Sequence, residues 1–479
     1  MPDNLKKKFV SGIAWNIVDK LISQFGFLIV TLYLAKLIGP ESFGLIGMLT
    51  IFMLLAESVV SSGFSQALVQ RSADLTADDA STIFYVNLVY GLTIYGLLYF
   101  AAPLIAEFYG EAALTDISRL LFLIIIINSL AVVVRAQLTI RIDFRSQAIA
   151  GAFATVISSS IGLYLAISGY DYWSLVWMLI LRSLVQTVSL WFFTRWLPSL
   201  VFNFDSFKSL FGFGSNLMLA GLVSTLVNNL YIALVGKYFN AASVGYFTQA
   251  TNLTNFLSKF ISSTMQGVSY PILTSIKQDS ERLTAVFRKT LQLTMFISLP
   301  ALVGFAAVAR DFVELFLGSQ WLPAVPIIQI LCFARAITPI SIVNMNILNA
   351  IGRSDLYLKV DLVKLPLTVG TLLVSVNFGV ESVAIAVLIN VLMSFLINSY
   401  FPGKLFGFGA LNQLKAAKSY LLAAGVMFIV VKFVGFSGDW YWLPINIGVG
   451  AVVYFGVLLL FRDDVFLSLA YKLGKRFRF

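Results

Sequence analysis

Long apolar segments separated by short polar connections dominate this sequence. A helix that crosses a bilayer needs roughly 20 mainly apolar residues. The first such segment follows Lys6, Lys7 and Lys8; its length and its internal Asp19 and Lys20 distinguish it from a signal peptide, so we expect it to be retained. Windows of the required length occur fourteen times, at residues 9–36, 42–68, 82–105, 117–135, 147–168, 172–194, 209–236, 243–274, 286–309, 321–350, 357–376, 383–402, 418–434 and 442–461. The pattern predicts an all-α, polytopic membrane protein with about 14 transmembrane helices.

A short motif occurs twice along the chain. Residues 34–44, LAKLIGPESFG, recur 201 positions later as residues 235–245, VGKYFNAASVG, with Lys, Ser and Gly in register. Each copy follows the first helix of a block of six, and an even number of helices gives both blocks the same orientation. Parallel repeats suit a transporter whose two lobes rock around a central site. We expect an N-terminal lobe at 1–200, a C-terminal lobe at 201–402, and two extra helices with a basic tail at 403–479.

Lys and Arg residues fall mostly on one side of the predicted membrane. With the N-terminus in the cytoplasm, 23 of the 33 lie in cytoplasmic segments, four in outer segments and six within helices. Because cytoplasmic loops carry the excess of Lys and Arg, both termini are predicted to be cytoplasmic. The net charge of +10 then reflects these loops and a tail on anionic lipid, not a nucleic-acid site. Four tryptophans fall at outer helix ends, as an interfacial belt would place them: Trp173, Trp321, Trp440 and Trp442.

Composition argues against an enzyme. Charged residues make up only 12% of the chain, histidine is absent, and Cys332 is the single cysteine. Histidine is the commonest general base and the commonest metal ligand. No connection between predicted helices exceeds about twenty residues, too short for a soluble catalytic domain. We therefore predict no catalytic residues, no metal site and no cofactor.

Four segments resemble landmarks of a known family. Residues 39–44 (GPESFG) and 63–71 (GFSQALVQR) resemble the N-terminal signature of Wzx-type polysaccharide flippases, and residues 270–277 (YPILTSIK) and 349–353 (NAIGR) resemble its later landmarks. The similarity covers nearly the whole chain and is greatest to the colanic-acid branch. This family is part of the multidrug, oligosaccharidyl-lipid and polysaccharide exporter superfamily. The resemblance implies two six-helix lobes, two extra helices, and movement of an undecaprenyl-diphosphate-linked oligosaccharide to the outer leaflet of the bacterial inner membrane, for exopolysaccharide, O-antigen or capsule synthesis.

Several cations lie deep within the predicted helices. Near a helix centre each costs roughly 2.5–3.5 kcal/mol unless it faces a cavity or a partner. Long stems also let such side chains snorkel to the headgroups, an alternative that stays open, above all for Lys364. A diphosphate is bound by Arg as a bidentate fork and by Lys as a point charge. We predict that the substrate site contains Lys20, Arg182, Lys259, Arg335 and Lys364.

One predicted helix carries a polar stripe. Its members follow one another at steps of three or four: Thr248, Asn252, Asn255, Lys259, Ser262 and Gln266. Facing lipid, the stripe would expose amides to hydrocarbon. Hydrogen bonding between packed helices is the alternative, but six polar positions along a whole span favour a water-lined wall. We therefore add Asn252 and Asn255 to the predicted substrate site, as partners for sugar hydroxyls.

Two carboxylates, Asp19 and Glu57, also lie deep. Each is a candidate for coupling transport to an H⁺ or Na⁺ gradient. Each could equally form an ion pair with a cation on another helix. Without histidine, coupling must use these acids or the membrane potential acting on the charge of the substrate.

Two other functions stay open on the sequence alone. A drug or cation antiporter of the same superfamily would want an anionic pocket, whereas the deep charges here are mostly positive. A membrane sugar polymerase or ligase would need a substantial outer loop and acid–base groups. The favoured interpretation implies three partners: a lipid-linked oligosaccharide, membrane lipids, and polysaccharide polymerase or export machinery.

Overall fold

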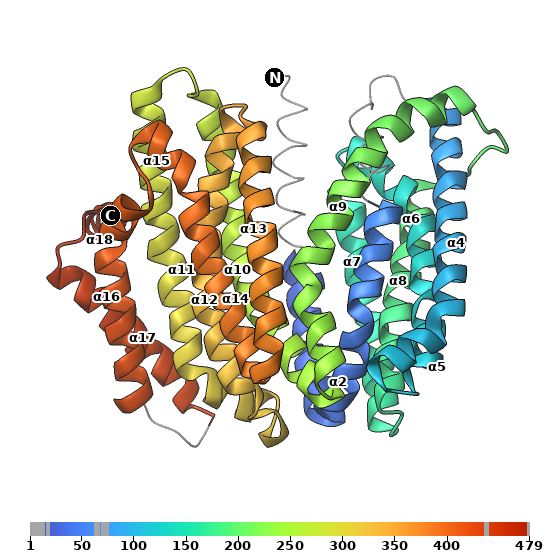
Figure 1. The fold of residues 1–479 in the computed structure, drawn as a ribbon, viewed down its shortest axis with the longest axis horizontal. Helices are drawn as coiled ribbons and strands as arrows, with labels where there is room; N and C mark the ends of the chain where they lie inside the picture. The colour runs from blue at the N-terminus through green and yellow to red at the C-terminus, as the bar shows by residue number, and fades with distance from the viewer. Residues whose placement is uncertain (1–14, 16–19, 62–67, 69–75, 435–439, 477–479) are drawn as a thin grey trace. The chain divides into compact units, whose positions relative to one another are not determined.

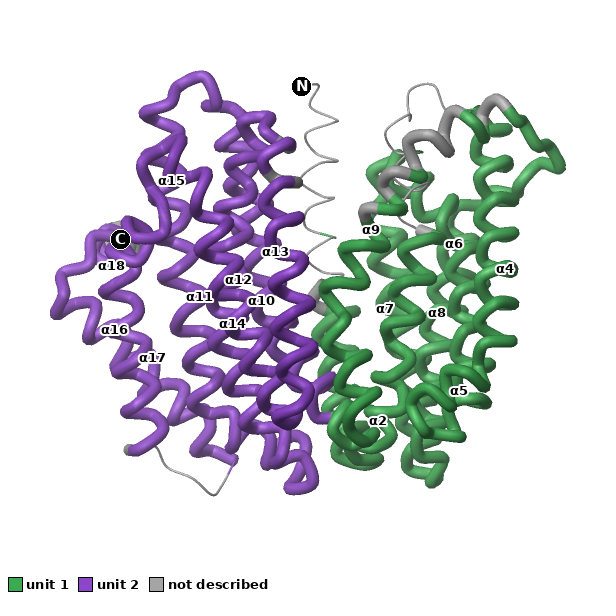
Figure 2. Tube along the Cα trace, in the orientation of Figure 1, with its two compact units in different colours: residues 1–245 green, residues 246–479 purple. Residues whose placement is uncertain are grey.

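The computed structural model describes residue 15 and residues 20–61, 68, 76–434 and 440–476. These ranges form helices joined by short connections, and no β-strand occurs in them (Figure 1). The chain divides into two compact units, residues 1–245 and residues 246–479, which we call unit 1 and unit 2 (Figure 2). The boundary between the two units falls one helix later than the boundary predicted at residue 200. The predicted six-helix lobes are not tested by this division.

Unit 1 contains a bent helix at the first copy of the repeat. At Gly39 the backbone has a φ of 77°, which glycine adopts without strain. Pro40 follows and has no N–H for the helical ladder, so the bend separates two of the predicted spans. The described helices of unit 1 are η1 (Lys20–Phe25), α2 (Gly26–Ser61), α4 (Ala77–Tyr109), α5 (Leu114–Leu121), α6 (Leu123–Ile140), α7 (Phe144–Ile167), α8 (Tyr172–Thr194) and α9 (Phe204–Tyr238).

Unit 2 begins within α10 and continues to the last described residue. Its described helices are α10 (Ala241–Ser275), α11 (Ser280–Phe316), η2 (Ser319–Trp321), α12 (Ala324–Ala350), α13 (Ser354–Ser375), η3 (Val376–Phe378), α14 (Val380–Asn398), α15 (Tyr400–Phe406), α16 (Ala410–Val434), α17 (Trp442–Leu460) and α18 (Asp464–Arg476). The extra helices α16 and α17 pack on α11.

The polar connections supply the caps that start the long helices. The side chains and backbone amides of Thr76 and Asp79 bond to each other reciprocally at the start of α4. Asp143 accepts a hydrogen bond from the Ser146 amide at the start of α7, and Asp279 caps α11 in the same way. Such caps satisfy amides that have no partner in the first helical turn.

The predicted all-α membrane architecture is confirmed. Every predicted span overlaps a described helix, the spans at 9–36 and 42–68 only in part because some of their residues lie outside the described ranges. Eleven described helices are long and apolar enough to cross a membrane. Helix α2 accounts for two of the fourteen predicted spans. Helices α9 and α10 have the length but lie outside the eleven, and α10 is the helix with the predicted polar stripe.

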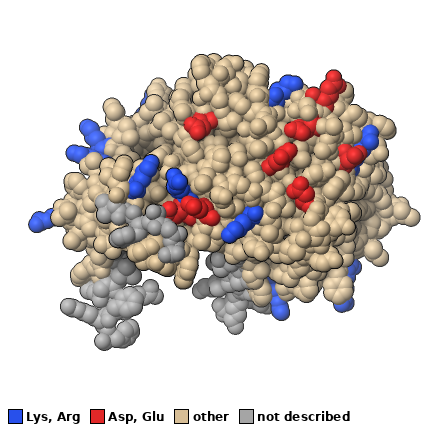
Figure 3. Space-filling view, turned by 90° about the horizontal axis from the view of Figure 1, so that it is seen from below, with Lys and Arg blue, Asp and Glu red and all other residues tan. Residues whose placement is uncertain are grey.

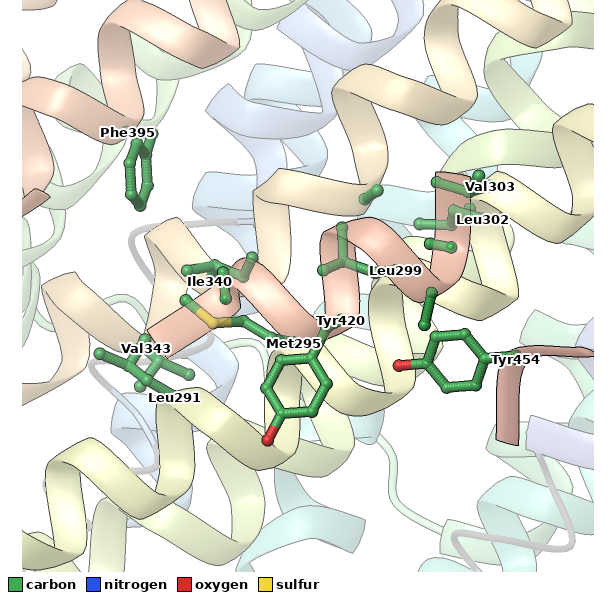
Figure 4. Packing of buried hydrophobic residues seen from close by; sticks show 14 of the residues in the cluster. Leu291, Met295, Leu299, Leu302, Val303, Ile340, Val343, Phe395, Tyr420 and Tyr454 are labelled. Carbon is green, nitrogen blue, oxygen red and sulfur yellow. The ribbon is translucent and has the colours of Figure 1, made fainter. Parts of the chain in front are cut away.

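Apolar side chains of α11, α12, α16 and α17 form the largest core of unit 2. Met295 and Leu299 of α11 pack there with Ile340 of α12 (Figure 4). Two tyrosines border this core, and their hydroxyls donate to oxygens: Tyr420 to Asp463 at 3.3 Å and Tyr454 to the carbonyl of Phe296 at 3.1 Å. Buried hydroxyls need such partners, so these bonds fix α16 and α17 in place.

The two copies of the repeat touch each other reciprocally within unit 1. A β-carbon added to Gly44 would overlap the carbonyl oxygen of Ala241, and one added to Gly245 would overlap that of Pro40. Gly44 and Gly245 are 201 positions apart, as are Pro40 and Ala241. Corresponding positions of the two copies are therefore in reciprocal contact, while the duplication of whole lobes remains a prediction.

One member of the expected aromatic belt is misassigned. Trp321 is 0% exposed and packs edge-on against Tyr246 at 5.9 Å between ring centroids, so it is a core residue of unit 2. Trp440, by contrast, is 70% exposed. The sequence pattern could not separate the two, because both tryptophans stand next to a helix start.

Cysteine labelling of intact cells tests the orientation in the membrane. Ser168 and Ser319 are exposed in the connections after α7 and α11, and Ser280 is exposed at the start of α11. With both termini cytoplasmic, cysteines at Ser168 and Ser319 should react with an impermeant reagent, while one at Ser280 should react only after permeabilisation. Outside labelling at Ser280 would contradict the topology. Ser42 is unsuitable, because it is 3% exposed and its hydroxyl bonds to Asp171.

The end of unit 1 at the α2 bend is the predicted outer end. Acidic and basic side chains are both scattered over the face seen from this side (Figure 3). Glu111 and Asp171 lie in the connections there, after α4 and before α8. The scarcity of cations in outer segments is what the positive-inside pattern requires.

Candidate substrate site in the membrane helices

Four of the five predicted cations have described side chains, and all four stand near the middle of their helices. Arg182 lies midway along α8, Lys259 along α10, Arg335 along α12 and Lys364 along α13. A cation at mid-helix is too far from either headgroup layer for easy snorkelling. The fifth, Lys20, is the first residue of η1, and its side chain lies outside the described part.

Arg182 is held against the first helix of unit 1. Its guanidinium carbon lies 3.8 Å from the centre of the Phe27 ring, and Nη2 donates to the carbonyl of Ser23 at 3.3 Å. Ser23 belongs to η1, the short helix that begins at Lys20, so the structure brings the backbone of Lys20 and Arg182 into one region. A cation over an aromatic ring gains about 2 kcal/mol when both are desolvated, which anchors Arg182 there.

Neighbouring bonds fix the rotation of α8. The Ser183 hydroxyl donates to the side-chain oxygen of Asn128, and the Trp191 indole donates to the Leu130 carbonyl at 3.0 Å. Both acceptors lie on α6. Because these bonds hold one face of α8 against α6, the Arg182 side chain lies on a face that contacts η1 and α2.

In unit 2 the helices of Lys259 and Arg335 run side by side in the same direction. The Ser258 hydroxyl donates to the Arg335 carbonyl at 3.1 Å, and further along the Gln266 amide donates to the side-chain oxygen of Asn346 at 3.1 Å. Lys259, next to Ser258, is exposed. Two predicted site residues, 76 positions apart in sequence, are therefore neighbours at one depth.

Neither of these two cations is neutralised by a carboxylate among the described residues. The ion pairs of the described chain are Arg353 with Asp355 and Lys364 with Asp361. The Nε of Arg335 is buried and has no hydrogen-bond partner among the described atoms. Cationic groups at mid-membrane depth without acidic partners are suited to an anionic ligand.

Lys364 differs from the other deep cations. Its ammonium lies 2.6 Å from Asp361 one turn earlier and donates to the side-chain oxygen of Asn398 on α14 at 3.1 Å. The charge of Lys364 is therefore paired within unit 2. Its place in the substrate site remains a prediction.

The polar stripe of α10 divides between surface and interior. Asn252, Lys259 and Gln266, at steps of seven, are exposed, and Asn255 is partly exposed. Ser262 is buried and bonds to the Ser258 carbonyl of its own helix. Only a subset of the six stripe residues is therefore exposed, and the water-lined wall remains a prediction.

The two coupling candidates are in different situations. Asp19 lies outside the described residues. Glu57 lies on α2 with an exposed side chain, and its role in coupling remains a prediction. Among the described residues, no group of three or more His, Cys, Asp and Glu could hold a metal ion.

Sequence reasoning missed a second set of polar residues at the end of α12. Asn346 and Asn349 face Gln266 across a pocket between α10 and α12. Asn349 belongs to a landmark segment, and Asn346 lies between Asn344 and Asn349 in α12 without a periodic pattern that marks it. Spacing alone gave no signal, because the pocket forms only where two helices meet.

Comparison with known proteins agrees with this arrangement. The sequence model of the family described as "Polysaccharide biosynthesis protein" matches residues 33–326. The teichuronic acid biosynthesis protein TuaB of Bacillus subtilis is 27% identical over 63% of this chain, and the chain spans 62% of that relative's length. The lipopolysaccharide biosynthesis protein WzxC of Escherichia coli is 24% identical, with 83% of this chain and 81% of WzxC covered.

A solved structure shares the fold. The lipid II flippase MurJ, in an inward closed conformation, superposes with a TM-score of 0.78 at 18% identity, covering 95% of this chain and all of MurJ. The helices define a multi-pass membrane protein, and its fold is shared with this flippase. The chain belongs to the polysaccharide biosynthesis protein family, as the resemblance to Wzx-type flippases predicted.

Proposed function

We propose that this protein flips an undecaprenyl-diphosphate-linked oligosaccharide from the cytoplasmic to the outer leaflet of the bacterial inner membrane by alternating access. The observation that carries the proposal is the pair of mid-helix cations Lys259 and Arg335, which have no acidic partner among the described residues. A diphosphate supplies the missing negative charge, and the exposed amides of α10 suit sugar hydroxyls.

The family supports this choice over its rivals. The relatives are named for the synthesis of teichuronic acid and lipopolysaccharide, and MurJ is a flippase of lipid II. The product would enter exopolysaccharide, O-antigen or capsule synthesis, where a polymerase or export machinery would receive it. A drug or cation antiporter would need unpaired acids in place of the unpaired cations.

Transport in liposomes tests the proposal. Purified protein is reconstituted with a fluorescent undecaprenyl-diphosphate oligosaccharide, and the outward-exposed fraction is followed with a membrane-impermeant quencher. We expect flipping that depends on the protein and that undecaprenyl diphosphate without sugar inhibits. No flipping by protein that retains its melting temperature, with or without H⁺, Na⁺ and voltage gradients, would overturn the proposal.

The same liposomes test Glu57 as a coupling group. Glutamine at position 57 keeps the size of the side chain and mimics the protonated acid. If its protonation differs between the inward- and outward-open states, Glu57→Gln should lose gradient-driven accumulation while downhill exchange survives, since a ligand shifts an equilibrium only through differential affinity. Glu111→Gln, an outer-connection acid of the same unit, is the matched control. A Glu57→Gln protein with undiminished gradient dependence would exclude the coupling role.

A further inference from the structure

A pocket of about 590 Å³ lies between the ends of α10 and α12, wholly within unit 2. Its volume falls in the range of roughly 300–1,000 Å³ that is usual for small-molecule sites. Two of the landmark segments, residues 270–277 and 349–353, converge on it, although they are distant in sequence. None of the residues that line it carries a charge.

One amide in the wall of this pocket is buried and only half satisfied. Asn346 is 3% exposed, and its side-chain oxygen accepts from Gln266 at 3.1 Å. Its Nδ2 group is buried and has no hydrogen-bond partner among the described atoms. Leaving a buried donor unpaired is unfavourable, so a hydroxyl placed in the pocket would be stabilised by accepting from this group.

The helix itself adds an acceptor and leaves space. Pro271 has no N–H, so the helical ladder gives the Gly267 carbonyl no donor from four residues ahead. Gly267 has no side chain, and a β-carbon there would meet no atom within 4 Å. Tyr270, also in the wall, is 41% exposed and offers an aromatic face.

These groups match the chemistry of an uncharged sugar. Sugar rings present hydroxyls, which donate and accept, and C–H faces, which pack on aromatic rings. Phosphate is bound most strongly by cations, and none of the residues in the wall is charged. Gln266 lies seven residues from Lys259, about 10 Å along the helix, within reach of a sugar attached to a diphosphate held at Lys259.

We propose that this amide-lined pocket binds an uncharged sugar ring of the lipid-linked oligosaccharide, separately from the cations that hold its diphosphate. The proposal rests on the function proposed above. It assigns selection of the sugar to Gln266, Asn346 and Tyr270, at the end of α10 predicted to be cytoplasmic, where the substrate enters.

Filling the pocket is the first test. Gly267→Trp places a large ring in open space, so the protein should keep its melting temperature while the flipping rate of the labelled oligosaccharide lipid falls by about tenfold or more, the factor that 1.4 kcal/mol represents. Gly425→Trp is the matched control, because Gly425 is exposed in α16 and also has no atom within 4 Å of an added β-carbon. Flipping at the wild-type rate by Gly267→Trp would overturn the pocket while leaving the proposed function intact.

Cysteine protection distinguishes sugar from phosphate. Cys332 is 0% exposed, so a Gly267→Cys thiol should be the reactive one in the full chain. Its modification by a methanethiosulfonate reagent should slow by about fivefold or more when the oligosaccharide lipid is present at several times its Kd, and undecaprenyl diphosphate without sugar should protect far less. Gly425→Cys should react equally in all cases. Equal protection by both lipids, or by neither, would contradict a sugar site. If the wild-type protein does not flip the lipid at all, the proposed function fails rather than this inference.

Discussion

Replacing Gly44 or Gly245 with alanine is expected to abolish polysaccharide export and to lower the melting temperature of the purified protein. Each added methyl group would overlap a backbone carbonyl oxygen of the other copy of the repeat, Ala241 in one case and Pro40 in the other. Overpacking typically costs about 1–3 kcal/mol and occasionally more. Backbone atoms of a helix cannot rotate away as a side chain can, so the upper part of that range applies.

Two further glycines of unit 1 give a graded control for this prediction. A β-carbon at Gly236 would lie 2.7 Å from the Tyr109 ring, which can shift, and one at Gly96 would meet nothing within 4 Å. Alanine is favoured over glycine inside a helix by roughly 0.5–1 kcal/mol, so Gly96→Ala should be neutral or slightly stabilising and Gly236→Ala intermediate. Melting temperatures and complementation of export should follow this order. If Gly44→Ala and Gly245→Ala behave like Gly96→Ala, the reciprocal contact is wrong.

Removing the unpaired cations of unit 2 should impair transport without destabilising the protein. A hydrogen bond to a charged group contributes about 1.5–3 kcal/mol, so Lys259→Ala and Arg335→Ala should each slow flipping by about tenfold to a hundredfold. The melting temperature should stay unchanged or rise, because a deep cation itself costs roughly 2.5–3.5 kcal/mol in the membrane. Slower flipping without a lower melting temperature indicates a ligand site, whereas a structural role would lower the melting temperature as well.

The controls for the cation variants come from the same unit. Lys289→Ala removes an exposed cation near the start of α11. It should leave the flipping rate and the melting temperature unchanged. Arg335→Lys keeps the charge but loses the planar fork, so it should restore only part of the rate if the contact is bidentate. Wild-type flipping by both Lys259→Ala and Arg335→Ala, or a large fall in melting temperature in both, would remove the diphosphate site from these helices.

The sequence by itself determined the class of protein, the helices and the repeat. Apolar length is a local property that the bilayer imposes on every span, so each predicted segment overlaps a described helix. Even the bend of α2 follows from adjacent Gly39 and Pro40. The depth of Arg182, Lys259 and Arg335 was equally readable, because position along a helix fixes depth. The family followed from short segments that specify turns and close contacts.

Only the tertiary structure decided which way each side chain faces and what it meets. Trp321 and Trp440 both stand beside a helix start, but one is core and the other is exposed. Lys364, like Lys259, stands near the middle of its helix, but its ammonium pairs with Asp361 and bonds to Asn398. The pocket around Asn346 joins residues from two helices. Periodicity describes one helix at a time, whereas pairing, burial and pockets depend on how neighbouring helices are rotated, which their combined packing sets.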